Sequence, residues 1–271
     1  MTRPYAEVIG DPIEHSRSPL IHNFWLEVLG IDADYRRHRV DRATLPAYLA
    51  ERRADPDWRG TNVTMPLKLD ALHLADEATD QALAAGAANL LMRRNGGLTA
   101  VNTDVRAIGM LLGRLAKRGA AFGSVTILGN GGAARAALVA LKLLGVSAVR
   151  IQARDMVAAR KLSVEFGLDV GPAPLTAPIE SDGLINATPL GMPGRDCLNC
   201  ELGGLPDKGW VFDMVTDPDD TPLLQAARAR GLRTVAGLDM LVEQADRSFR
   251  LLFGVDAPRD RDVDLWQKLG R

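Results

Sequence analysis

The sequence is poor in cysteine, in net charge and in long apolar runs, and each absence excludes a class of protein. Its 271 residues carry a formal net charge of −1, which gives no reason to expect nucleic acid or an anionic membrane as partner. No apolar run approaches the length of a membrane-spanning helix, and the first residues lack the apolar stretch of a signal peptide. We therefore expect a cytoplasmic protein that binds neither nucleic acid nor membrane.

The only two cysteines, Cys197 and Cys200, stand in a C-x-x-C spacing. A redox pair and half of a zinc site share this spacing. The sequence offers no second pair and no nearby histidine, and the surrounding glycine, proline and aspartate residues indicate a loop. We interpret both cysteines as structural and predict no metal site.

The composition is that of a globular protein, with 46% hydrophobic and 25% charged residues. The length suits one large domain or two modest ones, and no internal repeat or low-complexity segment interrupts it. Residues 1–104 alternate between strand and helix patterns. Strands are predicted at 7–9, 35–40, 60–63, 89–92 and 98–101, and helices at 19–29, 44–54 and 66–75, the last begun by Pro66.

The last two of these strands flank an Asn-Gly pair that suits a hairpin turn, so this part predicts a mainly parallel sheet with one antiparallel strand. A helix over 105–115 leads into a second α/β unit. Its strands are predicted at 125–128, 149–153, 184–186, 211–213 and 234–236, and its helices at 133–144, 156–166 and 222–229. A long helix over 240–253 then returns to the first unit.

The predicted fold class is therefore α/β with two α/β domains. A substrate-binding domain covers 1–104 and is completed by C-terminal helices over 239–271, and a Rossmann-like dinucleotide-binding domain covers 105–238. A cleft between two such domains is a natural place for a small ligand and a cofactor to meet.

The stretch from Val125 to Arg135 reads as a strand, a glycine-rich turn and a helix. Glycines let the backbone approach a ligand, and the first N–H groups of the helix favour an anion such as a diphosphate. The spacing Gly129-x-Gly131-Gly132-Ala133 is shorter than the full G-x-G-x-x-G motif, so a plain strand–helix connection is the alternative.

Two serines, Ser16 and Ser18, precede the first helix and could bind hydroxyls or a carboxylate; alternatively, Ser18 caps a helix that begins at Pro19. Lys68 falls in the first turn of a helix, where the dipole opposes its charge and favours its use as a base. Asp104 follows a strand end, so lysine and aspartate at the carboxyl ends of neighbouring strands could form a proton-transfer pair or a surface ion pair.

Taken together, these stretches resemble the shikimate dehydrogenase family over nearly the whole chain. The resemblance is carried by Val8–Pro12, His15–Pro19, His22-Asn23, Asn62–Thr64 with Pro66 and Lys68, Gly86–Asn89, Asn102–Asp104, Gly129–Arg135, Asn186–Met192, Phe212–Val215 and Gly237–Ala245. The family reversibly reduces 3-dehydroshikimate to shikimate with NADPH, a step in aromatic amino acid biosynthesis. The resemblance implies this oxidoreductase activity here.

The resemblance also implies roles for individual residues. Lys68 and Asp104 would be the catalytic pair. The substrate ring would be held by Ser16, Ser18, Thr64, Asn89 and Gln244, with Thr216 next to it. The cofactor would be held by Gly129, Asn130, Gly131, Gly132, Ala133, Ala153, Arg154, Asp155, Asn186, Thr188, Val215 and Gly237. Asn186 and Thr188 have an alternative role as a strand end with a capping threonine.

The sequence departs from the family pattern in four places, one of which is Ala153-Arg154-Asp155 where the family has Asn-Arg-Thr. Asn130 replaces an alanine in the glycine turn, and Asp239 stands where glycine is usual. Thr216 replaces a tyrosine next to the substrate, which leaves quinate or a related acid open as substrate. Arg154 suits the 2′-phosphate of NADP, whereas Asp155 would repel a phosphate or accept from the ribose hydroxyl of NAD. We favour NADP.

Two other readings stay open: an NAD-preferring quinate/shikimate dehydrogenase, and a non-catalytic sensor of dehydroshikimate or quinate. A sensor could lose Lys68 or Asp104, and both are present. A folate dehydrogenase/cyclohydrolase would share the two-domain architecture but should lack the H-S-x-S-P segment. This chain has that segment at His15–Pro19, which counts against such an enzyme. The sequence does not choose between a monomer and a homodimer.

Overall fold

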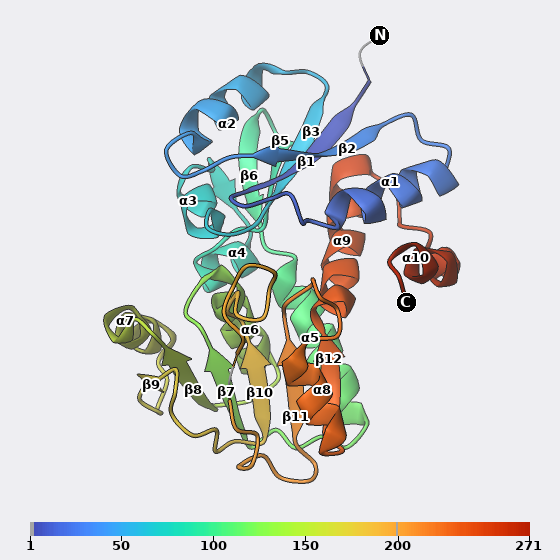
Figure 1. The fold of residues 1–271 in the computed structure, drawn as a ribbon. Coiled ribbons are helices and arrows are strands. Elements are labelled where there is room, and N and C mark those ends of the chain that lie inside the picture. The colour runs from blue at the N-terminus through green and yellow to red at the C-terminus, as the bar shows by residue number, and fades with distance from the viewer. Residues whose placement is uncertain (1–2, 199) are drawn as a thin grey trace. The chain divides into compact units, whose positions relative to one another are not determined.

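The computed structural model describes residues 3–198 and 200–271 of the chain (Figure 1). It contains two compact units, of which unit 1 comprises residues 1–103 and 242–271 and unit 2 comprises residues 104–241. The chain thus leaves unit 1 once and returns to it. From the sequence, we expected the chain to pass between the domains after residue 104 and again after residue 238; in the structure it does so after residues 103 and 241. In the part of the chain described, no helix is both long enough and apolar enough to span a membrane.

Unit 1 is built on a six-stranded sheet of order β2-β1-β3-β5-β6-β4. Its strands are β1 (Tyr5–Gly10), β2 (Asp34–Arg39), β3 (Trp58–Val63), β4 (Glu77–Ala78), β5 (Leu90–Arg94) and β6 (Gly97–Val101). Strand β5 runs antiparallel to both of its neighbours, β3 and β6, and the other pairs are parallel. The predicted parallel sheet with one antiparallel strand is confirmed.

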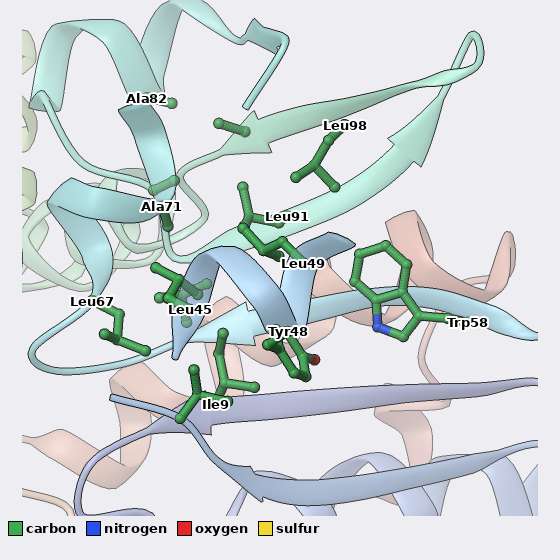
Figure 2. Close-up of a cluster of buried hydrophobic side chains, with 14 of the residues drawn as sticks. Ile9, Leu45, Tyr48, Leu49, Trp58, Leu67, Ala71, Ala82, Leu91 and Leu98 are labelled. Atoms are coloured by element: carbon green, nitrogen blue, oxygen red, sulfur yellow. The ribbon is translucent and has the colours of Figure 1, made fainter. Parts of the chain in front are cut away.

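Helices cover both faces of this sheet. The helices of unit 1 are α1 (Ser18–Val28), α2 (Leu45–Ala54), α3 (Lys68–His73), α4 (Asp80–Ala85), η1 (Arg259–Arg261), α10 (Asp262–Lys268) and the greater part of α9 (Gly237–Phe253). On one face, Leu45 and Leu49 of α2 and Ala71 of α3 pack with Ile9 and Leu91 of the sheet (Figure 2). On the other face, Leu252 of α9 packs against strand residues such as Val8.

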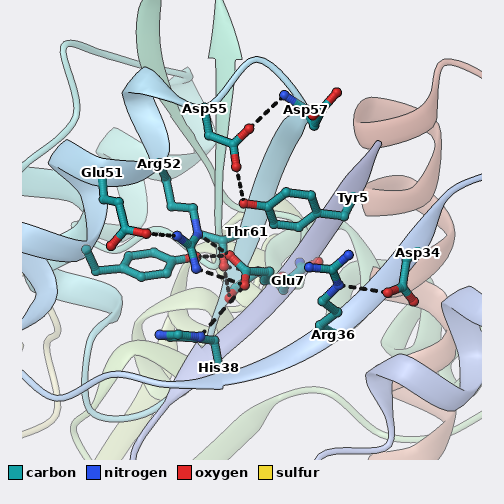
Figure 3. A network of polar contacts seen from close by, with 12 residues as sticks. Tyr5, Glu7, Asp34, Arg36, His38, Glu51, Arg52, Asp55, Asp57 and Thr61 are labelled. Carbon is teal, nitrogen blue, oxygen red and sulfur yellow. Dashed lines mark hydrogen bonds and ion pairs between the residues drawn. The ribbon is translucent and has the colours of Figure 1, made fainter. Parts of the chain in front are cut away.

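A buried ionic cluster fastens α2 to the sheet (Figure 3). Glu7 of β1 is only 2% exposed, and its carboxylate accepts hydrogen bonds from Tyr48 Oη at 2.6 Å and Arg52 Nε at 2.8 Å. Burial and the neighbouring Glu7 charge raise the pKa of Tyr48, so its hydroxyl stays a donor. Because a buried carboxylate is costly unless it is paired, these contacts fix α2 at one register on the sheet.

Unit 2 is built on a six-stranded, entirely parallel sheet of order β12-β11-β10-β7-β8-β9. Its strands are β7 (Ser124–Leu128), β8 (Ala148–Ala153), β9 (Ala173–Pro174), β10 (Gly183–Asn186), β11 (Trp210–Asp213) and β12 (Arg233–Ala236). Its helices are α5 (Asp104–Lys117), α6 (Gly132–Leu143), α7 (Met156–Phe166) and α8 (Pro222–Ala229). Renumbered from its first strand, this is the 3-2-1-4-5-6 order of the Rossmann fold. The predicted Rossmann-like fold is confirmed, although its strand order was not predicted.

Several expectations about elements need correction. Strands β4 and β9 and helix α4 were not predicted, because two-residue strands and a six-residue helix carry too little periodicity. The 66–75 helix begins at Lys68 rather than at Pro66, which precedes it in a turn closed by Leu67 N donating to Thr64 O. Strands β3 and β6, which lead to Lys68 and Asp104, are not neighbours, because β5 lies between them.

Candidate active site

The antiparallel strand β5 explains how polar residues from three strands gather at one sheet edge. Strands β3 and β6 run in the same direction, so their carboxyl ends lie at the same edge as the amino end of β5. Asn89 precedes β5, and its main chain bonds to both neighbours: Val63 N donates to Asn89 O, and Asn89 N donates to Val101 O. The residues after β3 and β6 therefore flank Asn89.

A buried hydrogen-bond network orients the side-chain amides of Asn89 and Gln244. Asn89 Oδ1 accepts from Thr103 N at 2.7 Å, and Asn89 Nδ2 donates to Thr103 Oγ1 at 2.9 Å. Gln244 Oε1, from α9, accepts from Thr103 Oγ1 at 3.3 Å and from Asn89 Nδ2 at 3.4 Å. All three residues are less than 10% exposed. The network fixes which end of each amide is the donor.

Lys68 and Thr64 belong to the same edge. Lys68 is the first residue of α3 and is half-buried, and its carbonyl accepts from Ala88 N at 2.8 Å, next to Asn89. Thr64 N donates to Ile9 O, and the turn packs so closely on Gly10 that a Cβ there would lie 2.4 Å from Thr64 Cγ2. Only glycine at position 10 allows this approach.

Asp104 is the first residue of α5 and follows Thr103 directly. It is 3% exposed, and the N-terminus of a helix is a favourable place for a carboxylate. The strand predicted at 98–101 ends at Val101 as expected, and Asn102 and Thr103 separate its end from Asp104. Asn102 anchors the connection, because its Nδ2 donates to Ala87 O at 2.8 Å.

Ser16 and Ser18 lie at the start of α1. The helix begins at Ser18, its capping position is Arg17, and no side chain there makes a capping bond. The alternative role of Ser18 as the cap of α1 is therefore wrong. Ser18 is 4% exposed and Ser16 is half-buried, and Ser16 Oγ accepts a long 3.4 Å hydrogen bond from Ser18 N.

In unit 2 the glycine turn joins β7 to α6. Gly129 has φ +102°, a backbone conformation that favours glycine, and a Cβ on it would lie only 3.1 Å from Ala187 O. A Cβ on Gly131 would meet nothing within 4 Å. The turn, with half-buried Asn130 and Ala133, places the first N–H groups of α6 at the carboxyl edge of a parallel sheet, the position for a phosphate group.

Arg154 and Asp155 follow Ala153 at the end of β8, and the two side chains differ in their surroundings. Arg154 is exposed. Asp155 Oδ1 accepts from the main-chain nitrogens of Val157 and Ala158, both at 3.0 Å, as the capping residue of α7. Its charge therefore interacts with the helix N-terminus, a role that the sequence analysis did not foresee.

Asn186 ends β10 and is fully buried. Its Nδ2 donates to Asp213 Oδ1 at 2.8 Å, and its Oδ1 accepts from Thr188 N and Oγ1, so the side chain holds the loop that follows. Asp213 also accepts from Val215 N at 3.1 Å and from Thr221 Oγ1 at 2.7 Å. Burial raises the pKa of Asp213. These contacts hold the end of β10 and the loop after it, and the cofactor role of Asn186 and Thr188 stays a prediction.

Gly237 is the first residue of α9 and lies in close contact with Val215. A Cβ on Gly237 would lie 2.2 Å from Val215 O, so glycine is required there. Thr216 is half-buried next to Val215. Asp239 Oδ2 accepts from Ala236 N at 3.2 Å, in the first turn of α9, where its charge is favourable.

Cys197 is exposed and Cys200 is half-buried, and both are free thiols. Burial, helped by the Asp213 charge, raises the pKa of Cys200 to about 11, so this thiol stays protonated near neutral pH. Asn199 between them lies outside the described residues. Across residues 3–198 and 200–271, no three histidine, cysteine or acidic side chains cluster as metal ligands.

Two buried residues of the site were missed because their patterns are those of ordinary core positions. Ser248 of α9 donates to Gln244 O at 3.0 Å, and its Oγ accepts from Asn62 Nδ2 at 2.9 Å. Tyr35 Oη donates to Asn62 Oδ1 at 2.7 Å. The only available signal was the spacing of Gln244 and Ser248, two polar residues at i and i+4 on a face that otherwise faces the core.

Comparison with known proteins agrees with this geometry. Residues 8–91 match the family model "Shikimate dehydrogenase substrate binding domain", and residues 237–262 match "Shikimate 5'-dehydrogenase C-terminal domain". A Sphingopyxis alaskensis protein named shikimate dehydrogenase (NADP(+)) is 47% identical over 264 residues, which cover 97% of this chain and 95% of the relative.

Solved structures of similar proteins agree over almost the full length. Shikimate 5-dehydrogenase from Thermus thermophilus, in complex with NADP(H) and shikimate, is 33% identical with a TM-score of 0.84, covering 98% of this chain and 99% of that one. Quinate dehydrogenase from Corynebacterium glutamicum, in complex with NAD, is 31% identical with a TM-score of 0.85 at the same coverage. This chain belongs to the shikimate dehydrogenase family.

Proposed function

We propose that this chain catalyses the reversible NADPH-dependent reduction of 3-dehydroshikimate to shikimate. The observation that carries the proposal is the buried network in which Thr103 orients Asn89 and Gln244, on a sheet edge shared with Thr64 and Lys68. Oriented amides and hydroxyls suit a small ring that bears hydroxyl groups and a carboxylate. A site of this kind rejects analogues that lack a hydroxyl, because its own buried polar groups would be left unpaired.

In this proposal unit 1 holds the substrate. Ser16 and Ser18 bind the carboxylate of the ring. Thr64, Asn89 and Gln244 bind its hydroxyl groups and complete the contacts to the carboxylate. Serine and threonine hydroxyls can both donate and accept, so they adapt to either group. The relative from Thermus thermophilus, whose structure contains shikimate and NADP(H), supports this choice of substrate.

Lys68 and Asp104 form the proposed catalytic pair. During reduction the ring carbonyl becomes a hydroxyl, and Lys68 donates the proton that its oxygen gains; during oxidation Lys68 accepts that proton. Asp104 orients the same oxygen and shares its hydrogen-bond network. Bound NADPH supplies the hydride that goes to the carbonyl carbon.

Unit 2 holds the cofactor in this proposal. The N–H groups of the Gly129–Ala133 turn would face the diphosphate. Glycine at 129 permits the positive φ of this turn and its close approach to the main chain of Ala187. Exposed Arg154 binds the 2′-phosphate of NADP as a planar donor. Asp155 does not oppose this, because its carboxylate is engaged by the amides of α7. Val215 and Gly237, which lie against each other, would line the nicotinamide site.

The assay that tests the proposal measures NADPH or NADH formation with shikimate and with quinate, each against NADP+ and NAD+. We expect turnover of shikimate with NADP+ to exceed the other three combinations. A preference for NAD+ or for quinate would instead favour the second candidate, a quinate/shikimate dehydrogenase. The likeness to the Corynebacterium glutamicum enzyme, and the small Thr216 where the family often has tyrosine, make it the relevant alternative.

The sensor alternative is disfavoured because Lys68 and Asp104 are both retained. We also propose that the protein acts in the cytoplasm. Light scattering on the purified protein distinguishes a monomer of 29.2 kDa from a homodimer of twice that mass.

A further inference from the structure

The side chain of Arg37 holds the main chain of Ser16. Arg37 lies on β2, the edge strand of the unit 1 sheet, and its Nε and Nη2 both donate to Ser16 O, at 2.8 and 2.6 Å. A guanidinium presents its donors in one rigid plane, so two bonds to a single oxygen fix both its position and its direction. No pattern in the sequence predicts this contact between Arg37 and Ser16.

This contact is one of three along the same strand. Two residues before Arg37, the main chain of Tyr35 exchanges two hydrogen bonds with the Asn23 amide of α1, each 2.9 Å long. Two residues after it, Arg39 Nε donates to Asp11 Oδ1 at 2.8 Å. The side chains of Arg37 and Arg39 point to the same face of the sheet, because positions two apart on a strand do so, whereas the Tyr35 contact is made by main-chain groups at the free edge of β2.

The segment from Asp11 to Asn23 therefore runs back along the edge of β2, held at its beginning, middle and end. At its end, the Asn23 side chain forms hydrogen bonds with the main-chain N and O of Tyr35, which an edge strand would otherwise present to solvent. The middle contact is at Ser16, whose N–H also donates to Ile13 O at 3.0 Å. Ile13 holds the main-chain nitrogen of Ser16, and Arg37 holds its carbonyl oxygen. Together they orient the peptide groups on both sides of Ser16 and the start of α1 that follows.

We propose that Arg37 is a positioning residue for substrate binding: it holds Ser16, and through it Ser18, in the orientation that receives the ring carboxylate. The proposal rests on the proposed function, in which these two serines bind the substrate. Arg37 is exposed and lies outside the hydrophobic core, so its removal leaves the packing of the sheet intact. Its effect is expected on substrate affinity rather than on the chemical step.

The test compares R37A and R37K with R36A in the full chain. Arg36 is the matched control, because it lies on the opposite side of β2, over the Tyr5 ring and bonded to Asp34 (Figure 3). We expect R37A to raise KM for shikimate about tenfold, with kcat within about threefold and KM for NADP+ within about twofold. R37K keeps one charged donor and should recover part of the loss, and R36A should match the parent.

Two results would overturn the proposal: an unchanged KM for shikimate in R37A, or equal rises in both KM values together with a lowered Tm, which would indicate a structural role only. S16A and S18A separate this failure from that of the proposed function. If they raise KM for shikimate and R37A does not, the serines bind substrate and only the role of Arg37 is wrong. If neither serine variant changes KM, the serine assignment fails and the proposal fails with it.

Discussion

At the scale of the residue, Lys68 is the side chain on which the proposed chemistry depends. It begins α3, where a cation gains nothing from the helix dipole and therefore needs another reason to be there. We expect K68A to lower kcat by about 10²–10⁴-fold, the range for loss of a general acid or base. The fold should be little affected, since the side chain is only half-buried.

Steady-state kinetics and a thermal melt of K68A and K68M check this prediction. Methionine preserves the length of the side chain but not its proton, so it should be as inactive as alanine. K117A, at an exposed position near the end of α5, serves as control and should match the parent. Turnover near the parental value in K68M would show that Lys68 does not transfer the proton.

His22 makes the fold sensitive to acid. It is fully buried in α1, its ring stacks on Tyr35 with centroids 4.0 Å apart, and among the described residues neither ring nitrogen has a hydrogen-bond partner. Burial lowers the pKa of His22 from 6.5 to about 3. As the pH falls below 6.5, the unfolded chain therefore takes up a proton that the folded protein does not, and stability is lost until the pH approaches 3.

We predict that H22F removes this loss. Relative to the parent, its free energy of unfolding should improve by about 2 kcal/mol between pH 7.5 and pH 5, following about 1.4 kcal/mol per pH unit below 6.5. Any constant packing cost of the larger ring cancels in this difference. Urea unfolding at the two pH values measures it, with H73Q at an exposed position as control. Parallel pH dependence of H22F and the parent would disprove the prediction.

At the scale of the element, the proposed choice of dinucleotide depends on the turn between β8 and α7. In the sequence, Arg154 and Asp155 pointed to opposite cofactors. The structure separates them, because Asp155 caps α7 whereas Arg154 is exposed. We expect R154A to raise KM for NADP+ at least about tenfold more than KM for NAD+, since a lost charge-assisted contact to phosphate affects only the former.

D155T is the informative companion of R154A. Threonine retains a side-chain oxygen for the two amides of α7, so stability should change by less than about 0.5 kcal/mol. The preference for NADP+ over NAD+ should then change by less than about threefold, and kinetics with both dinucleotides measure it. A large gain of NADP+ affinity in D155T would mean that the carboxylate faces the phosphate after all.

The elements themselves show what a sequence can and cannot specify. Long periodic segments such as α5, α6 and α9 and the buried strands of unit 2 were placed within a few residues, because their own apolar spacing defines them. Short β4, α4 and β9 have no such spacing. The order of strands was beyond reach for the same reason: nothing local to β3 or β6 records that β5 lies between them.

The site residues divide in a similar way. Lys68, Asn89 and Gln244 stand in motifs that the sequence displays. The supporting groups, Thr103, Ser248 and Arg37, act through contacts between residues far apart along the chain, such as Arg37 with Ser16 or Asn62 with Ser248. Such contacts depend on the strand order and on the return of α9, so they emerge only once the fold is known.

At the scale of the whole molecule, the two units depend on the chain's C-terminal end to different degrees. Unit 2 is a continuous stretch, residues 104–241, with a complete parallel sheet and its own core. Unit 1 needs residues 242–271, because α9 supplies Gln244 and Ser248 to the polar network and Phe249 to the aromatic cluster with His22 and Trp25. Removal of this segment would expose one face of the unit 1 sheet.

We therefore predict that a chain ending at residue 241 retains a folded unit 2 and loses unit 1. It should bind NADP+ with an affinity close to that of the full chain, measured by calorimetry, and should show no binding of shikimate. Limited proteolysis should leave a resistant fragment close to residues 104–241, because a folded sheet is cleaved far more slowly than an unfolded segment. Retained shikimate binding would mean that α9 is dispensable for unit 1, whereas loss of NADP+ binding would mean that unit 2 cannot fold without its neighbour.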